Sequence, residues 1–332
     1  MKKITVLVTC YNEEKSIKNL YDRVSYIFNN VLINYDYEVV FCDNDSKDNT
    51  QSIIRDICAQ DGKCKAVFNT SNFGFHRNII QSFQYVEGDA AFLVFGDLQD
   101  PPELLTDFVE EWENGAQCVV GQRSKTDERG PKRVLRSLFY SVTDILAQRK
   151  LIHNMNGFGL YDRSFVDTVN EIEEVAPYFK SVIDEYGGDI RVIRYKQNSS
   201  ARGKSNFNFW SNYDFSMYGI TSSTKMLMRI ATFIGSFVAF AGFILAIFVL
   251  IKKVLFWDSY PVGNASTIIV VLALGGIQLL FIGILGEYIL TINERISRKP
   301  RCSIKEKINF DFGERINDGE KGILERKEVD TL

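Results

Sequence analysis

Two long apolar runs near the C-terminus constrain most strongly what this chain of 332 residues can fold into. Residues 230–251 carry no charged side chain, and residues 265–290 carry only one, Glu287. As an α-helix, the first run would be about 33 Å long, which is enough to cross the hydrocarbon core of a bilayer. A buried helix of a soluble protein is the alternative, but two runs of this length favour membrane spans. The sequence therefore predicts two C-terminal transmembrane helices.

Basic residues flank the outer ends of these runs and predict their orientation. Lys225 and Arg229 precede the first run, whereas the connection between the runs carries only Lys252 and Lys253 beside Asp258. The second run is followed by Arg295, Arg298, Lys299 and Arg301. Because basic residues are retained on the cytoplasmic side, we expect a multi-pass protein of the cytoplasmic (inner) membrane. Its N-terminal domain and both termini should be cytoplasmic.

Two further segments border the apolar runs. Residues 207–229 are rich in aromatic side chains and suit an amphipathic segment in the membrane interface, although an amphipathic helix packed on the soluble part explains them equally well. Residues 303–332 are charged and contain few aromatic side chains, so we expect a flexible cytosolic tail with no assigned role. Small residues in the second run would let the two helices approach closely. They are Gly275, Gly276, Gly283 and Gly286.

Residues 1–206 are expected to form a cytosolic α/β domain. Short apolar runs alternate with longer helical patterns over residues 1–125. The predicted strands are 4–9, 38–43, 64–68, 90–95 and 118–121, and the predicted helices are 13–29, 49–59, 75–86 and 102–114. Such alternation predicts a mostly parallel, doubly wound, Rossmann-like sheet. Ligands of such sheets bind beyond the carboxyl ends of the strands.

Polar and acidic residues follow three of the predicted strands, in the segments 9–13, 43–50 and 97–103. Turn and helix-capping chemistry would explain each segment alone. All three together at one edge of a parallel sheet predict a binding site. Carboxylates there suit hydrogen bonds from a nucleoside, or the binding of a hard divalent cation that bridges a diphosphate.

Several other classes of function are disfavoured. The net charge of −3 gives no electrostatic reason to expect a nucleic-acid partner. The six cysteines form no C-x-x-C pair and there are only two histidines, so we expect reduced, buried thiols and no zinc site. The sequence has neither a P-loop nor a G-x-G-x-x-G after the first strand, which argues against kinases, ATPases and dehydrogenases.

These strand-end segments resemble family 2 glycosyltransferases of the GT-A fold. The most specific parts are DLQDPPE at residues 97–103 and GEY at residues 286–288. The second is similar to the polyprenyl-phosphate branch, which includes bactoprenol glucosyltransferases and is related to dolichol-phosphate mannose synthases. The resemblance covers nearly all of the chain except the tail. It implies a metal-dependent enzyme of the cell envelope.

The resemblance also implies a reaction and its partners. A hexose would move, with inversion, from a nucleotide sugar to the phosphate of a polyprenyl (undecaprenyl) lipid, making a lipid-linked sugar for cell-surface glycans. UDP-glucose is the first expected donor, and UDP-N-acetylglucosamine or UDP-galactose are the next. Some related enzymes assemble as homo-oligomers, which glycine-rich spans permit.

Carried over residue by residue, the resemblance assigns roles to this chain. The metal, Mg²⁺ or Mn²⁺, would be held by Asp97 and Gln99, and the catalytic centre would contain Asp97, Asp100 and Arg133. The nucleotide sugar would contact Thr9, Tyr11, Glu13, Asp43, Asn44, Arg77 and Asp97. The acceptor phosphate would be bound by Arg123, Arg133, Ser137 and Arg202. A solvated basic helix face explains Arg123 and Arg133 equally well, and a helix start explains Arg77.

Two departures from the family pattern keep a second hypothesis open. Many relatives have Asp-x-Asp at the metal site, whereas this chain has Phe95 at the first position, and a carboxylate proposed near the acceptor in some relatives is Gly157 here. A catalytically silent membrane scaffold is therefore the alternative, although the retained Asp43 and Asp97 argue against it. A processive polysaccharide synthase is disfavoured because the chain has no Gln-x-x-Arg-Trp motif.

Overall fold

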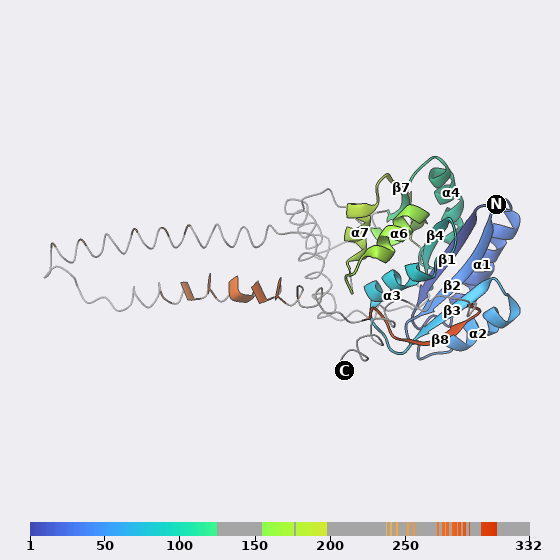
Figure 1. Ribbon diagram of the computed structural model, residues 1–332, viewed down its shortest axis with the longest axis horizontal. Helices are drawn as coiled ribbons and strands as arrows, with labels where there is room; N and C mark the ends of the chain where they lie inside the picture. The colour runs from blue at the N-terminus through green and yellow to red at the C-terminus, as the bar shows by residue number, and fades with distance from the viewer. Residues whose placement is uncertain are drawn as a thin grey trace, which may run out of the picture.

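The described part of the chain is built around one twisted sheet. The structure, a computed structural model, describes residues 1–124, 155–175, 177–197 and 300–310, together with single helical positions between residues 237 and 292. The strands are β1 (Lys3–Cys10), β2 (Asp36–Asp43), β3 (Cys64–Asn69), β4 (Ala90–Phe95), β5 (Cys118–Arg123), β6 (Met155–Asp162), β7 (Ile190–Tyr195) and β8 (Ile304–Ile308). Their order in the sheet is β7-β5-β6-β4-β1-β2-β3-β8 (Figure 1).

The sheet is mostly parallel, as predicted. β1 pairs in parallel with both β2 and β4, β2 pairs in parallel with β3, and β5 pairs in parallel with β7. β6 and β8 run antiparallel to the strands beside them. The predicted strands within residues 1–124 match β1 to β5 with small shifts of their ends. The strands after residue 154 were not predicted.

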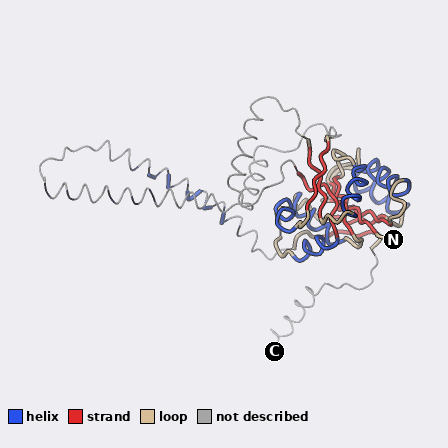
Figure 2. Tube along the Cα trace, turned by 90° about the horizontal axis from the view of Figure 1, so that it is seen from above, coloured by secondary structure: helices blue, strands red, loops and turns tan. Residues whose placement is uncertain are grey.

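Helices cover both faces of the sheet (Figures 1 and 2). The α-helices are α1 (Ile17–Asn30), α2 (Thr50–Gln60), α3 (Phe75–Ser82), α4 (Leu105–Glu113), α6 (Arg163–Glu171) and α7 (Phe179–Tyr186). Two 3₁₀ turns, η1 (Phe83–Tyr85) and η2 (Pro102–Leu104), extend α3 and precede α4. Figure 1 shows α3, α6 and α7 on one side of the sheet and α1 and α2 on the other.

The burial of β1 and β4 follows from this sandwich of layers. From Ile4 onward every residue of β1 is buried, and every residue of β4 is buried as well. Because both faces are covered, these strands read as continuous apolar runs rather than as alternating ones. α1 instead buries one stripe, which consists of Ile17, Leu20, Val24, Ile27 and Phe28. All six cysteines are free and buried, which confirms the expectation of unpaired thiols.

The predicted flexible tail 303–332 is wrong over its first residues. Ile304–Ile308 form β8, which pairs antiparallel with the edge strand β3. Ile304 and Ile308 pack against the core, and the three residues between them are charged. This strand pattern is too short to be recognised within a charged tail. Next to β8, Asn309 donates hydrogen bonds of 2.8 Å to the carbonyl oxygens of Cys58 and Cys64. Residues 311–332 lie outside the described residues.

β8 also changes the predicted domain boundary. The sheet of the domain expected at residues 1–206 is completed by a strand that comes from beyond residue 300. Arg55 of α2 holds this strand through an ion pair with Glu306 at 2.7 Å, and its guanidinium stacks on the ring of Phe68. The catalytic domain is therefore discontinuous in sequence.

The predicted membrane segments lie mostly outside the described residues. This applies to 207–229, 230–251 and 265–290, of which the structure describes only single positions. Among the residues that it does describe, none belongs to a helix both long and apolar enough to cross a bilayer. The described positions in the two apolar runs are helical, and their large apolar side chains are mostly exposed. Examples are Phe237, Phe240, Ile244, Ile282 and Ile289.

The β8 contact makes a stability prediction. Ile308→Ala removes apolar surface that packs against the core, so it should lower the free energy of unfolding by about 1–3 kcal/mol. Thermal unfolding of the full-length protein in detergent measures the change. Lys305→Ala, at an exposed position of the same strand, is the control and should melt like the wild type. Equal melting temperatures for the two variants would show that β8 does not stabilise the domain.

Candidate active site

The carboxyl ends of three strands meet at one edge of the sheet. In the β1–β2 register Cys10 lies opposite Asp43, and in the β1–β4 register Thr9 lies opposite Phe95. Backbone hydrogen bonds of 3.0 Å continue this pairing beyond the strands, from Asn44 N to the Cys10 carbonyl and from Gly96 N to the Thr9 carbonyl. The predicted segments 9–13, 43–50 and 97–103 therefore start side by side.

Asp43 is a buried acceptor at the centre of this edge. Its Oδ2 accepts hydrogen bonds from Ser46 N at 3.0 Å and from Gln51 Nε2 at 2.7 Å, and its Oδ1 accepts one from Ser46 Oγ. Burial raises the pKa of the Asp43 carboxyl, and the hydrogen bonds from Ser46 and Gln51 only partly offset this. The carboxylate is thus rigidly held and poorly solvated, which suits recognition of an N–H or hydroxyl group.

The loop after β1 is fastened to the loop after β2. Asn12 has a positive φ of 57°; its N–H donates to Ser46 Oγ at 2.8 Å, and its Oδ1 accepts from Lys47 N at 2.7 Å. Glu13 N donates to Thr50 Oγ1 at 2.7 Å. Three residues of the segment 9–13 were predicted to contact the nucleotide sugar. Thr9 and Glu13 are buried, and Tyr11 is half-buried. These contacts fix the β1 loop beside Asp43.

Four asparagines fasten a third loop to the same edge. Asn44 Nδ2 donates to Asn72 Oδ1 at 2.8 Å, and Asn44 Oδ1 accepts from Asn69 Nδ2 and from Phe73 N at 3.1 Å each. Asn69 Nδ2 also donates to Asn78 Oδ1 at 3.1 Å. Asn44 was predicted to contact the nucleotide sugar, and the structure places its side-chain amide inside this hydrogen-bond network. The network was not predicted, although an asparagine follows or ends each of β2 and β3.

Asp97 and Gln99 occupy the turn that follows β4. Asp97 is partly buried, and its Oδ1 accepts from Gln99 N at 3.2 Å across Leu98, which has a positive φ of 53°. Burial raises the pKa of the Asp97 carboxyl; the charge of Asp100 adds to the rise, while the Gln99 N–H and Arg123 oppose it. Asp97 is therefore an anion whose charge is destabilised by its surroundings.

The chemistry of this turn fits a hard divalent cation. Asp97 supplies carboxylate oxygens and Gln99 an amide oxygen, the donor types that Mg²⁺ and Mn²⁺ prefer. A cation beside Asp97 would also relieve the penalty of burying its charge. Among the described residues no group of three or more His, Cys, Asp or Glu side chains could hold a metal by itself. Such an ion would therefore depend on substrate phosphate oxygens and water for its other ligands.

Asp100 is the hub of a buried polar network. Only 1% of it is exposed, and it accepts hydrogen bonds from Arg123 Nη2 at 3.1 and 3.2 Å, from Asn156 Nδ2 at 2.6 Å and from the Tyr195 hydroxyl at 2.5 Å. These contacts orient the guanidinium of Arg123, whose side chain stays 30% exposed. The structure thus places Asp100 as the residue that positions Arg123. Asn156 and Tyr195 were missed, because nothing in their local sequence links them to Asp100.

Four predicted site residues are left, of which one lies in α3 and three lie outside the described residues. Arg77 lies in the first turn of α3 near Cys302; burial raises the pKa of that thiol to about 11, and the charge of Arg77 opposes the rise. Three further residues were predicted to act at the acceptor or the catalytic centre, and they lie outside the described residues. They are Arg133, Ser137 and Arg202.

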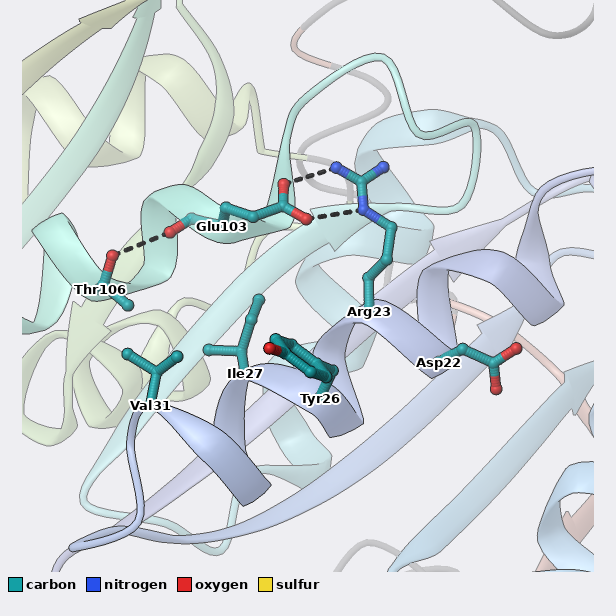
Figure 3. A pocket seen from close by; sticks show the side chains of 7 residues that line it. All are labelled: Asp22, Arg23, Tyr26, Ile27, Val31, Glu103 and Thr106. Carbon is teal, nitrogen blue, oxygen red and sulfur yellow. Dashed lines mark hydrogen bonds and ion pairs between the residues drawn. The ribbon is translucent and has the colours of Figure 1, made fainter.

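A separate pocket of about 460 Å³ lies between α1 and the η2–α4 segment (Figure 3). An ion pair between Arg23 and Glu103 at 2.5 Å closes one side of it. It is lined by Asp22, Arg23, Tyr26, Ile27, Val31, Glu103 and Thr106, none of which is a predicted site residue. Both acidic side chains of the lining are in ion pairs, Glu103 with Arg23 and Asp22 with Lys18, so the pocket offers no recognisable catalytic chemistry.

The raised pKa of Asp97 makes a prediction for stability against pH. The folded protein binds the Asp97 proton more tightly than the unfolded chain, so the ionised carboxylate destabilises the fold at neutral pH. Asp97→Asn keeps the shape without the charge, and without divalent cation it should melt at a higher temperature than the wild type at pH 7.

The advantage of Asp97→Asn should shrink as the pH falls and the wild-type carboxyl becomes protonated. Thermal unfolding with a chelator present, at pH 7 and at about pH 4, measures it. Asp22→Asn, on the exposed side of α1, is the control. An Asp97→Asn variant that melts below the wild type at pH 7 would contradict the assignment of a destabilised anion.

Comparison with known proteins identifies the family. Residues 5–169 match the family model of glycosyl transferase family 2. A bactoprenol glucosyl transferase of Shigella phage SfX is 33% identical over 92% of this chain and 99% of the relative. A prophage bactoprenol glucosyl transferase homolog of Escherichia coli K12 is 31% identical over 91% and 98%.

A more distant relative agrees with these. A putative glycosyltransferase CsbB of Bacillus subtilis is 29% identical over 91% of both chains. The similarity to these relatives extends well past the residues that the family model matches. The chain is a glycosyltransferase and belongs to glycosyl transferase family 2, with the α/β GT-A fold of that family.

Proposed function

We propose that this chain transfers glucose from UDP-glucose to the phosphate of a polyprenyl lipid such as undecaprenyl phosphate. The observation that carries the proposal is that Asp43 and Asp97 lie at the same edge of the sheet. Asp43 suits recognition of the nucleoside, and Asp97 suits binding of a metal ion and the diphosphate. Similarity to bactoprenol glucosyl transferases over almost their whole length supports the choice of sugar and lipid.

The donor lies across the three strand ends. Asp43 accepts a hydrogen bond from the base or the ribose, and Thr9, Tyr11 and Glu13 line the same pocket. Asp97 and Gln99 would hold a Mg²⁺ or Mn²⁺ ion, which would neutralise charge on the diphosphate. Arg123, oriented by Asp100, supplies a fixed positive charge at the end of β5, which β6 separates from β4. The site therefore stabilises charge at both ends of the reacting bond.

The reaction breaks the bond between the anomeric carbon and the diphosphate oxygen. An oxygen of the lipid phosphate attacks that carbon from the opposite face and keeps the new bond, so the configuration inverts and UDP leaves. The acceptor phosphate monoester is largely ionised near neutral pH, since its second pKa is about 6. A strong general base is therefore unnecessary, and catalysis depends on positioning and charge. This agrees with Asp100 being used to orient Arg123 rather than to move a proton.

The lipid acceptor requires the site to face a membrane. We propose that residues 230–251 and 265–290 cross the cytoplasmic membrane and that 207–229 lies at its surface, with the catalytic domain and both termini cytoplasmic. Exposed apolar side chains at helical positions such as Phe237, Phe240 and Ile282 support this placement, because lipid would cover them. Polyprenyl phosphate would then reach the site from the inner leaflet. A homo-oligomer stays a prediction.

A transfer assay tests the function. Full-length protein in detergent is supplied with undecaprenyl phosphate, a divalent cation and UDP-glucose, UDP-N-acetylglucosamine or UDP-galactose, and the mass of the lipid product is measured. Asp97→Ala should reduce transfer by about 100-fold or more while the protein stays folded. Asp22→Ala, an exposed carboxylate on α1, is the control. A near-normal rate for Asp97→Ala would contradict the metal assignment, and a folded wild type without turnover on any donor would favour a scaffold.

The acceptor contact makes a separate prediction. If Arg123 binds the lipid phosphate, Arg123→Ala should raise the KM for undecaprenyl phosphate by about 10- to 150-fold, the equivalent of about 1.5–3 kcal/mol for a charge-assisted hydrogen bond. The KM for the donor should change much less. Arg55→Ala removes an arginine of similar exposure at the far edge of the sheet and is the control. A KM for the lipid that matches the control would show that Arg123 has a structural role only.

A further inference from the structure

Four rings form a continuous aromatic cluster beside the strand ends. Phe75, at the start of α3, packs on Phe95, the last residue of β4, with ring centroids 5.2 Å apart. His76 contacts Phe75 at 5.4 Å and Tyr178, next to α7, at 5.0 Å. The cluster therefore runs from the end of β4 to the start of α7. We call it the aromatic wall.

The aromatic wall presents one open ring. Phe95 is 8% exposed and supports Phe75, which is 44% exposed at the surface of the domain. Burial, together with a smaller effect from the charge of Lys180, lowers the pKa of His76 to about 4, so the imidazole is neutral at physiological pH. The rings of Phe75, Phe95 and His76 thus carry no charge at physiological pH. Nearly half of the Phe75 side chain is therefore available for contact with a ligand.

The position of Phe75 is fixed from two directions. Phe95 lies two residues before Asp97, so the ring below Phe75 sits at the entrance to the turn that holds Asp97 and Gln99. The loop before Phe75 is anchored through Asn44, the residue after Asp43. From Phe75 the wall continues through His76 to Tyr178, next to α7. The open ring therefore packs on a residue that precedes, by two positions, the aspartate proposed to serve the cation and the diphosphate.

We propose that Phe75, supported by Phe95, is a platform on which the hexose ring of the donor stacks, which makes Phe75 a specificity-determining residue. This inference rests on the proposed function. The sugar is the part of a nucleotide sugar that lies beyond the diphosphate. Its C–H groups carry a slight positive charge and pack well on the negative face of an aromatic ring. An uncharged ring gives no such attraction for a phosphate.

The platform also gives Phe95 a role. The Asp-x-Asp pattern of relatives has a carboxylate where this chain has the ring that supports Phe75. A carboxylate at residue 95 could not form the ring contact observed with Phe75. Phe75 and Phe95 would thus act as a pair, and the single carboxylate Asp97 would serve the cation.

The test compares the binding of UDP-glucose with the binding of UDP to full-length protein by calorimetry, which needs no acceptor. Phe75→Ala should weaken UDP-glucose about 3- to 10-fold and leave UDP unchanged, because only the sugar loses its contact. Phe75→Tyr keeps the ring and should bind UDP-glucose like the wild type. Tyr26→Ala removes an exposed ring of α1 and should change neither affinity.

Three results would overturn the platform. They are an equal loss of UDP and UDP-glucose in Phe75→Ala, an unchanged affinity for both, and a wild type that binds UDP-glucose no more tightly than UDP. The transfer assay separates this failure from that of the proposed function. Lipid-linked glucose formed by the wild type would uphold the function even if Phe75 proved neutral. Binding of UDP-glucose that depends on Phe75, without any lipid product, would uphold the platform and reject the acceptor.

Discussion

The parallel pairing of β4, β1 and β2 is the constraint on which the whole site depends. Because neighbouring parallel strands end at the same edge, residues far apart in sequence, such as Cys10, Asp43 and Phe95, reach that edge together. The loops that leave it then cross-link through short polar contacts, among them those of Ser46 and Asn44. The sheet thus supplies a rigid base and the loops supply the chemistry, which is how the domain can hold two acidic groups in fixed positions.

Two carboxylates of the site lower the stability of the folded domain. Burial raises the pKa of both Asp43 and Asp97, so each ionised carboxylate destabilises the fold at neutral pH until a ligand supplies a hydrogen bond or a positive charge. Asp100 accepts hydrogen bonds from Arg123, Asn156 and Tyr195, which surround it. These arrangements are consistent with different roles, in which Asp43 and Asp97 meet substrate and Asp100 positions an arginine.

The sequence predicts those features of the fold and the site that depend on local sequence pattern. The strands of residues 1–124 and their polar ends follow from apolar runs and from the rule for parallel sheets. Long-range contacts could not be predicted in the same way. β8 comes from a charged segment whose apolar residues, Ile304 and Ile308, have a role only once the edge of β3 is available. Likewise, the contact of Tyr195 with Asp100 and that of Phe75 with Phe95 depend on how β7 and α3 pack, which no local pattern records.

Mapping the donor directly on the chain is the measurement that tests the central claim most closely. A photoreactive analogue of UDP, cross-linked to the full-length protein and located by peptide mass analysis, reports which residues surround the nucleoside. We expect labelling of residues 9–13 and 43–51 at the carboxyl edge, and we expect excess UDP-glucose to suppress it. Labelling confined to the pocket between α1 and α4, or spread over the surface and insensitive to UDP-glucose, would contradict it.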